Sequence, residues 1–191
     1  MGKAEIIVAV TGASGSVLAR RALIHLFEQD VIVHLVISEA GRKVYHYEIG
    51  ETIEDTAQNA QNVIFHKNDD LFAPIASGSF DVLGMVIVPC SITTASKIAN
   101  GIGDNLICRA ASVCIKEKTP LVVVPRETPL SSIALANLLT LSQNGAFIMP
   151  PVPSFYDKKV SLDDITDAIA GRILSKLGVK NSLYAKWGDS L

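Results

Sequence analysis

The sequence has few charged residues and no long apolar segment. Charged side chains make up 19% of the 191 residues, and 17 Lys and Arg nearly balance 19 Asp and Glu. No basic run is present, which excludes the charge pattern typical of nucleic-acid-binding proteins, so we expect no nucleic acid partner. No apolar run approaches the roughly 18 residues that a membrane-spanning helix needs, and we expect no membrane insertion.

Cysteine and histidine are also sparse, and neither is spaced as a metal site would require. Cys90, Cys108 and Cys114 lack the CxxC spacing of metal and redox sites, and a disulfide scaffold would need many more cysteines. The four histidines show no ligand spacing either. We therefore expect reduced thiols, a cytoplasmic location and no metal ion.

The chain is nevertheless rich in apolar residues. Hydrophobic residues make up 49% of it and the mean hydropathy is +0.34. These values are high for a soluble monomer and predict apolar surface hidden between subunits. The length is typical of one domain, so we expect a single domain over residues 1–191. The polar tail from about residue 178 is predicted to contact a neighbouring subunit.

Apolar, β-branched segments alternate with helix-compatible segments along the chain. Several apolar segments are continuous, which is typical of a parallel sheet covered on both faces. The predicted strands are 5–10, 31–37, 62–66, 82–88, 121–124 and 146–149. The predicted helices are 17–29, 39–47, 93–99, 105–116, 131–143 and 162–177. We therefore predict a doubly wound, Rossmann-like, mainly parallel sheet in a three-layer α/β/α fold.

The glycine-containing turn after the first strand is the first candidate binding loop. Ligands of such folds bind beyond the carboxyl ends of the strands, so Gly12, Ala13 and Ser14 are expected to face one. Short-chain dehydrogenases share this TGASG turn, but Leu18 stands where their third glycine would be. No tyrosine is followed by a lysine four residues later either. The sequence thus disfavours an NAD-dependent dehydrogenase.

Two later loops carry further candidates. Hydroxyl groups gather at 91–94 after an apolar strand, although Ser91 and Thr94 could equally be plain helix caps. Arg126 and Glu127 interrupt the end of the apolar strand 121–124. Charges at that place need a ligand or each other, unless the loop is an ordinary solvated one.

Five segments together resemble the flavin prenyltransferase family. They are TGASGS, ASGSF, VPCSITTASKIANGIGDNLICRA, KEKTPLVVVPRETPL and PPVPSFYDKKVSLDDI. The resemblance runs in order from Val8 to about Trp187, and PRETPL followed by PPVPSFY is its most specific part. It implies a flavoprotein that binds FMN within the wider superfamily of homo-oligomeric flavin-containing cysteine decarboxylases.

The resemblance also implies roles for individual residues. The implied FMN-binding residues are Gly12, Ala13, Ser14, Ser38, Ser91, Ile92, Thr93, Thr94 and Arg109. The phosphate of dimethylallyl phosphate would be gripped, from more than one subunit, by Lys116, Arg126, Tyr156 and Arg172. The implied catalytic groups are Glu48, Glu127 and Ser14. In this hypothesis Glu127 protonates the departing phosphate, while Glu48 manages protons at the flavin. Taken singly, Glu48 and Arg172 could be surface residues and Tyr156 a packing aromatic.

The implied activity is transfer of a dimethylallyl group to N5 and C6 of reduced FMN. The product, prenylated FMN, would serve a UbiD-like partner decarboxylase, and the enzyme would be a homododecamer built from trimers. One alternative is an FMN-dependent decarboxylase of the cysteine type, which the absence of histidine from residues 76–83 disfavours. The other is a non-enzymatic flavin carrier, which the presence of Glu48 and Glu127 disfavours.

Overall fold

The computed structural model describes residues 2–155 and 161–184. Its centre is a six-stranded, all-parallel sheet with the strand order β3-β2-β1-β4-β5-β6. The strands are β1 (Ala4–Val10), β2 (Val31–Ile37), β3 (Val63–His66), β4 (Gly84–Cys90), β5 (Leu121–Pro125) and β6 (Phe147–Ile148). This order is that of a doubly wound fold, as the alternation of apolar and amphipathic segments predicts.

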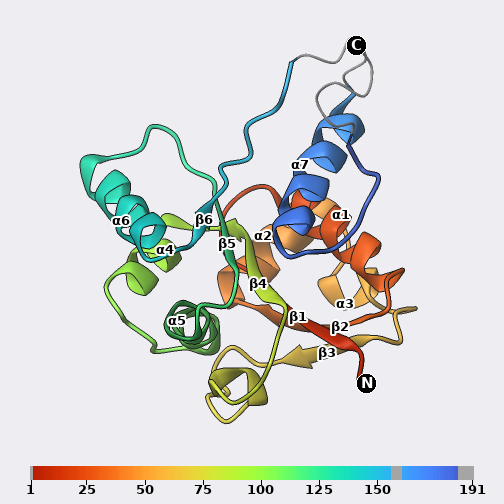
Figure 1. Cartoon of the computed structure of the whole chain (residues 1–191). Coiled ribbons are helices and arrows are strands. Elements are labelled where there is room, and N and C mark those ends of the chain that lie inside the picture. The colour runs from red at the N-terminus through yellow and green to blue at the C-terminus, as the bar shows by residue number, and fades with distance from the viewer. Residues whose placement is uncertain (1, 156–160, 185–191) are drawn as a thin grey trace.

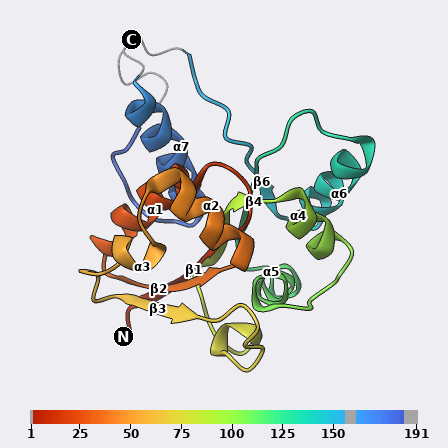
Figure 2. The same ribbon diagram turned by 180° about the vertical axis from the view of Figure 1, so that it is seen from behind.

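Helices cover both faces of the sheet (Figure 1). One face carries α1 (Ser16–Phe27), α2 (Glu39–Ile49), α3 (Ile53–Thr56) and α7 (Leu162–Lys176). The other carries a 3-10 turn η1 (Pro74–Ala76), α4 (Ile92–Ala99), α5 (Leu106–Glu117) and α6 (Ser132–Gln143). The view from behind shows the same three layers (Figure 2).

Two apolar cores fill the spaces between the layers because successive side chains of a strand point to opposite faces. Ile6, Val8 and Val10 of β1 pack with α1 and α7, whereas Ile7 and Ala9 pack with α4 and α5. A strand buried on both faces must be continuously apolar, which explains the uninterrupted segments in the sequence. In the part of the chain that is described, no helix is long and apolar enough to cross a membrane.

The structure differs from the sequence-based expectation at several element boundaries. The fourth strand starts at Gly84 and continues to Cys90, so residues 89–90, which were expected after the strand, belong to it, and residues 82–83 do not. The last strand contains only residues 147–148. The short α3 and η1 were not expected, because neither shows an apolar period. Helix α2 extends to Ile49 and therefore includes Glu48.

The first part of the predicted tail folds back on its own chain. The side chain of Asn181 donates to the carbonyl of Gly171 in α7 at 3.0 Å. A Cβ on Gly171 would lie 2.8 Å from atoms of Leu183 and Tyr184, so this glycine permits a close approach. The remainder of the tail lies outside the described residues, and its contact with a neighbouring subunit stays a prediction.

Candidate functional site

The candidate site lies where the strand order reverses, between the carboxyl ends of β1 and β4. From this point the chain enters α1 on one face and α4 on the other, which opens the crevice where doubly wound folds bind ligands. The amino end of α2 lies nearby, because the backbone N–H of Ser38 donates to the carbonyl of Val10 at 3.0 Å. Three helix N-termini therefore meet at this edge of the sheet.

Thr11 joins the two loops that border the crevice. Its buried hydroxyl donates to the carbonyl of Pro89 at 2.9 Å and accepts from the backbone N–H of Ser91 at 2.7 Å. The hydroxyl thus uses its one proton and one of its lone pairs to fix the start of α4 against the end of β1. Sequence reasoning did not single out Thr11, although it opens the TGASG turn.

The amino end of α1 has no cap of its own. Its N-cap residue is Gly15, in a left-handed conformation with a φ of 113°, and its first turn contains no acidic residue. Glu48, at the end of α2, fills this role from a distance. Its carboxylate accepts from the backbone N–H of Gly15 at 3.0 Å and from that of Ser16 at 2.7 Å. Such an N-terminus attracts anions, because unpaired N–H groups and the helix dipole coincide there.

The environment of Glu48 favours its ionised form. Partial burial acts to raise the pKa of this carboxyl, but hydrogen bonds from the Ser14 side chain and from the Ser16 and Gly15 N–H groups outweigh it. The net effect is a lowered pKa. Glu48 is therefore an anion at neutral pH, held beside Ser14 as the sequence predicted.

Arg126 and Glu127 reach the same edge from β5. The Arg126 Nε donates to the carbonyl of Ser14 at 3.3 Å, which connects the loop after β5 to the loop after β1. The Glu127 carboxylate accepts from the adjacent N–H of Thr128 at 3.0 Å, and both charged side chains are exposed. Ser14, Glu48 and Arg126 thus gather around one turn of backbone, with Glu127 next to them in sequence.

The hydroxyl loop at 91–94 is the start of α4. Ser91 is its N-cap, since its Oγ accepts from the N–H of Thr94 at 3.2 Å and lies 3.0 Å from the Thr94 hydroxyl. The capping interpretation is therefore correct for Ser91. Ile92 and Thr93 lie in the first turn of α4. Thr93 is exposed, and Ser91, Ile92 and Thr94 are half-buried. Capping does not exhaust the hydrogen-bonding capacity of two hydroxyls.

The structure gives Gly12 and Ser38 packing and capping roles. A Cβ on Gly12 would lie 2.6 Å from the Cβ of Ala40, so the absence of a side chain lets β1 and the start of α2 approach closely. Ser38 is the N-cap of α2, as the sequence predicted, with its Oγ accepting from the Gly41 N–H at 3.0 Å. Ala13 is buried in the turn between β1 and α1.

Arg109 lies on α5, and within one chain its side chain contacts η1 rather than the residues around Ser14. Its Nε donates to the carbonyl of Ala76 in η1 at 2.9 Å, and the residue is exposed. The guanidinium keeps its two terminal amino groups for another partner. A planar, permanently charged group of this kind is suited to a phosphate.

Two of the predicted phosphate-binding cations lie away from this edge. Lys116 is at the carboxyl end of α5, paired with Glu117 and next to Gly78. Arg172 is on the exposed side of α7, five residues before Leu177, which packs against Gly84 at the opposite end of the sheet. One chain therefore does not bring these cations to Ser14 and Arg126. Tyr156 lies outside the described residues.

A cavity elsewhere on the surface is separate from the candidate site. A cavity of about 520 Å³ is lined by residues including Lys3, Phe27 and Asn62, and none of the candidate site residues lines it. It lies beyond the carboxyl end of α1, at the edge of the sheet where β1 and β2 begin. The candidate site is instead an open edge rich in hydrogen-bond donors.

The donor set at this edge suits a flavin mononucleotide. Hydroxyls, helix N-termini and arginine side chains are the groups that bind phosphates, and backbone N–H groups also pair with the polar edge of an isoalloxazine ring. The hydroxyls of Ser91 and Thr94, the Arg109 guanidinium and the turn around Ala13 supply these groups. The residues present therefore fit FMN.

Comparison with known proteins places this chain in a family. The flavoprotein family model matches residues 1–174. A flavin prenyltransferase, UbiX, from Thermoplasma acidophilum is 50% identical over 183 residues, which cover 96% of this chain and 99% of the relative. The crystal structure of AnUbiX (PadA1) in complex with FMN and dimethylallyl pyrophosphate is 40% identical, with a TM-score of 0.92 and coverage of 97% and 98%.

A second solved structure agrees over the same length. It is a dodecameric FMN-dependent UbiX-like decarboxylase from Escherichia coli O157:H7, 38% identical, with a TM-score of 0.91 and coverage of 96% of this chain and 98% of that one. The similarity thus extends over nearly the whole chain. The chain belongs to the flavoprotein family and, within it, to the flavin prenyltransferases.

Proposed function

We propose that this protein transfers a dimethylallyl group from dimethylallyl phosphate to N5 and C6 of reduced FMN. The observation that carries the proposal is the likeness, at a TM-score of 0.92, to a relative in complex with FMN and dimethylallyl pyrophosphate. The gathering of Ser14, Glu48 and Arg126 at the switch point supports it, because these groups suit an anionic leaving group and proton transfer.

The FMN-binding part of the site would comprise the turn around Ala13, the amino ends of α2 and α4, and Arg109. When bound, reduced FMN supplies the electron-rich N5 and C6 atoms that accept the allylic carbon. The protein would orient that acceptor with Ser38 and the 91–94 loop. The backbone N–H of Ser38 is held by the Val10 carbonyl, and that of Ser91 by the Thr11 hydroxyl. Because hydrogen bonds hold these residues in place, they favour a single orientation of the acceptor.

The donor phosphate would bind beside Ser14 and Arg126. Charge grows on the phosphate as its bond to the allylic carbon breaks, and cationic donors stabilise that charge. Lys116, Tyr156 and Arg172 would complete this grip from neighbouring subunits, since one chain holds Lys116 and Arg172 away from the edge. The dodecameric relative supports an oligomer of this kind, for which we propose twelve subunits arranged as trimers.

The two glutamates would divide the proton transfers. The lowered pKa of Glu48 keeps it ionised, so it is suited to accept a proton at the flavin side of the site. Glu127 adjoins Arg126 and would deliver a proton to the departing phosphate. A UbiD-like decarboxylase would use the prenylated FMN. The three unpaired cysteines support a reducing, cytoplasmic location.

The proposal is tested by anaerobic incubation of the purified protein with reduced FMN and dimethylallyl phosphate, followed by mass spectrometry of the released flavin. The expected product is FMN with the mass of one added isoprenyl unit. Glu127→Gln is expected to slow its formation by about a hundredfold or more. Glu28→Gln, an exposed glutamate at the far end of α1, is the matched control and is expected to form product at the parent rate.

Three results would contradict the proposal. Unchanged flavin with both the monophosphate and the diphosphate donor would exclude prenyl transfer. Release of carbon dioxide from a peptide with a carboxyl-terminal cysteine, in the absence of a prenyl donor, would favour the cysteine-type decarboxylase. Tight FMN binding with neither reaction would favour a flavin carrier.

A further inference from the structure

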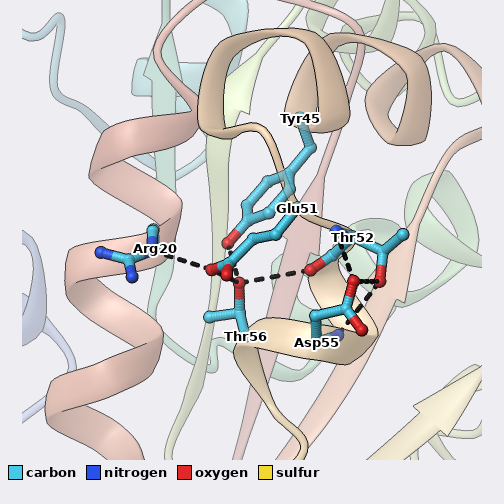
Figure 3. Close-up of polar contacts among 6 residues, drawn as sticks. All are labelled: Arg20, Tyr45, Glu51, Thr52, Asp55 and Thr56. Carbon is cyan, nitrogen blue, oxygen red and sulfur yellow. Dashed lines mark hydrogen bonds and ion pairs between the residues drawn. The ribbon is translucent and has the colours of Figure 1, made fainter.

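A chain of polar contacts joins α1, α2, α3 and the turn between α2 and α3 (Figure 3). The hydroxyl of Tyr45 lies 2.7 Å from the Oγ1 of Thr56. That Oγ1 donates to the carboxylate of Glu51 at 2.9 Å, and the Nε of Arg20 donates to the same carboxylate oxygen at 3.1 Å. Four side chains, from three helices and the turn between α2 and α3, are thus connected in series, and no role in the reaction described above uses them.

The direction of the hydrogen bonds in this series follows from proton counting. Thr56 has one hydroxyl proton, and the ionised carboxylate of Glu51 is a better acceptor for it than the carbonyl of Thr52, which is 3.4 Å away. The Tyr45 hydroxyl must then donate to Thr56. Burial raises the pKa of the Tyr45 phenol, so this proton stays in place across the physiological range.

The series brackets Glu48 along the chain. Tyr45 precedes Glu48 by three residues and Glu51 follows it by three, so both flank the last turn of α2. The end of a helix frays unless something holds it, because its last carbonyls have no partners within the helix. Here the buried ring of Tyr45 and the Glu51 carboxylate hold this turn on both sides of Glu48.

The series also ends on the helix that Glu48 caps. Arg20 lies one turn beyond Ser16 in α1, and Ser16 donates its N–H to Glu48. Two contacts, one turn of α1 apart, therefore fix the end of α2 and the turn that follows it against α1: Glu48 with the amino end of α1, and Glu51 with Arg20. The capping box between Thr52 and Asp55 fixes α3 and with it Thr56, as Figure 3 also shows.

We propose that Tyr45 and Thr56 are positioning residues that hold the Glu48 carboxylate on the amino end of α1. The proposal rests on the proposed function only for its catalytic consequence. Its structural half stands on the contacts themselves. Loss of either hydroxyl frees the last turn of α2, so the carboxylate spends less time on the Gly15 and Ser16 N–H groups. Its affinity for protons then rises toward that of an ordinary glutamate.

Hydrogen–deuterium exchange of the ligand-free protein tests the structural half. Tyr45→Phe and Thr56→Val each remove one hydroxyl and keep the shape of the side chain. Both are expected to speed exchange of the amides at residues 15 and 16 by about threefold to tenfold. Thr56→Ser, which keeps a hydroxyl, is expected to restore slow exchange. In a Glu48→Gln background the carboxylate that accepts from the amides of residues 15 and 16 is already replaced. Adding Tyr45→Phe should therefore speed their exchange little further.

Arg42→Gln is the matched control. Arg42 pairs with Glu54 and so also joins α2 to α3, but it does so from the first turn of α2, far from Glu48. This variant should leave exchange at residues 15 and 16 unchanged. Unchanged exchange in both Tyr45→Phe and Thr56→Val would overturn the positioning proposal. So would faster exchange spread evenly over the sheet, which would indicate only lost stability.

The pH profile of prenyl transfer tests the catalytic half. In Tyr45→Phe and Thr56→Val the acidic limb of the rate profile is expected to move up by about half a pH unit, and in Arg42→Gln it should stay in place. An unmoved limb together with faster exchange would refute the catalytic consequence. If the parent protein forms no prenylated flavin, the proposed function fails, while the exchange data still decide the positioning of Glu48.

Discussion

The carboxylate of Glu48 lies 2.7 Å from the backbone N–H of Ser16, so an anion from α2 caps the amino end of α1. The two residues are 32 positions apart in the sequence. An N-terminus of this kind is also where a phosphate would bind. The Ser14 side chain donates to Glu48, and if the donor phosphate binds beside Ser14 as proposed, the phosphate and the Glu48 carboxylate would share this donor. Such sharing would link substrate binding to the protonation of Glu48.

The Glu48 interaction predicts how stability depends on pH. The pKa of Glu48 is lowered in the folded state, so its contribution is complete above the ordinary value of 4.5 and is lost as the pH falls through the lowered folded value. The thermal midpoint of the parent should therefore exceed that of Glu48→Gln by a constant margin near neutrality. The margin should shrink below pH 4.5.

A second variant checks that the hydrogen bonds cause this effect. Ser14→Ala removes one donor to Glu48, so the folded pKa lies closer to the ordinary value. The thermal midpoint of Ser14→Ala should exceed that of the double variant Ser14→Ala/Glu48→Gln by a smaller margin than in the parent background. This margin should also be lost at a higher pH than in the parent background. A margin that stays constant down to pH 3.5 would contradict the assignment of the lowered pKa to these contacts.

Thr11→Val is predicted to make the start of α4 more mobile. It changes no side chain that is proposed to contact a ligand. Valine keeps the shape but leaves the N–H of Ser91 without its partner, which costs about 1–3 kcal/mol of unfolding free energy. The start of α4 then shifts more freely, and FMN binding should weaken by about tenfold, as titration of flavin fluorescence would measure.

Thr140→Val is the control for Thr11→Val. The hydroxyl of the half-buried Thr140 donates to the Ala136 carbonyl within α6, away from the candidate site, so its loss should change neither stability nor FMN affinity appreciably. Equal effects of the two substitutions would show that the hydrogen bonds of Thr11 between the loops after β1 and β4 contribute no more to stability or FMN affinity than the Thr140 hydrogen bond does.

The fold could be predicted from the sequence because its signals are local. Segments such as 31–37 and 121–124 are continuously apolar, and burial on both faces of a parallel sheet requires that pattern. The end of β4 was placed too early because Pro89 and Cys90 resemble a turn, although both lie in the strand. The four-residue α3 has no apolar period and gave no signal of its own.

The candidate site could be predicted only in part because its contacts are long-range. Motif resemblance identified Ser14, Glu48 and Arg126, and the structure brings these three together. It could not indicate that Glu48 caps α1, because that contact depends on how two helices pack. Thr11 and Tyr45 were overlooked for the same reason, since each acts through a partner distant in sequence.

Gly12 is predicted to be required for packing rather than for conformational freedom. Gly12→Ala would place a Cβ 2.6 Å from the Cβ of Ala40 and should cost about 1–3 kcal/mol of unfolding free energy. Ala40→Gly removes the opposing atom, so the double variant should recover much of that loss in denaturant titrations. Gly103→Ala, whose nearest contact would be 3.7 Å, is the control. Failure of Ala40→Gly to compensate would assign the requirement for Gly12 to something other than this contact.

The separation of Lys116 from Arg126 within one chain predicts complementation between subunits. If each site takes Arg126 from one subunit and Lys116 from another, Lys116→Ala and Arg126→Ala should each be nearly inactive alone. Co-expression would produce mixed assemblies in which some sites receive both native residues. Random mixing of equal amounts gives about a quarter of such sites, so prenyl transfer should recover to about a quarter of the parent rate.

Mixing two variants of the same residue controls for this result. Arg126→Ala with Arg126→Gln cannot produce a native site and should stay inactive, while size-exclusion chromatography confirms that the assemblies form. No recovery in the Lys116→Ala and Arg126→Ala mixture, despite proven co-assembly, would mean that both residues act from the same subunit. Lys116 would then have to move from its pairing with Glu117 at the far end of α5, which its place in the fold opposes.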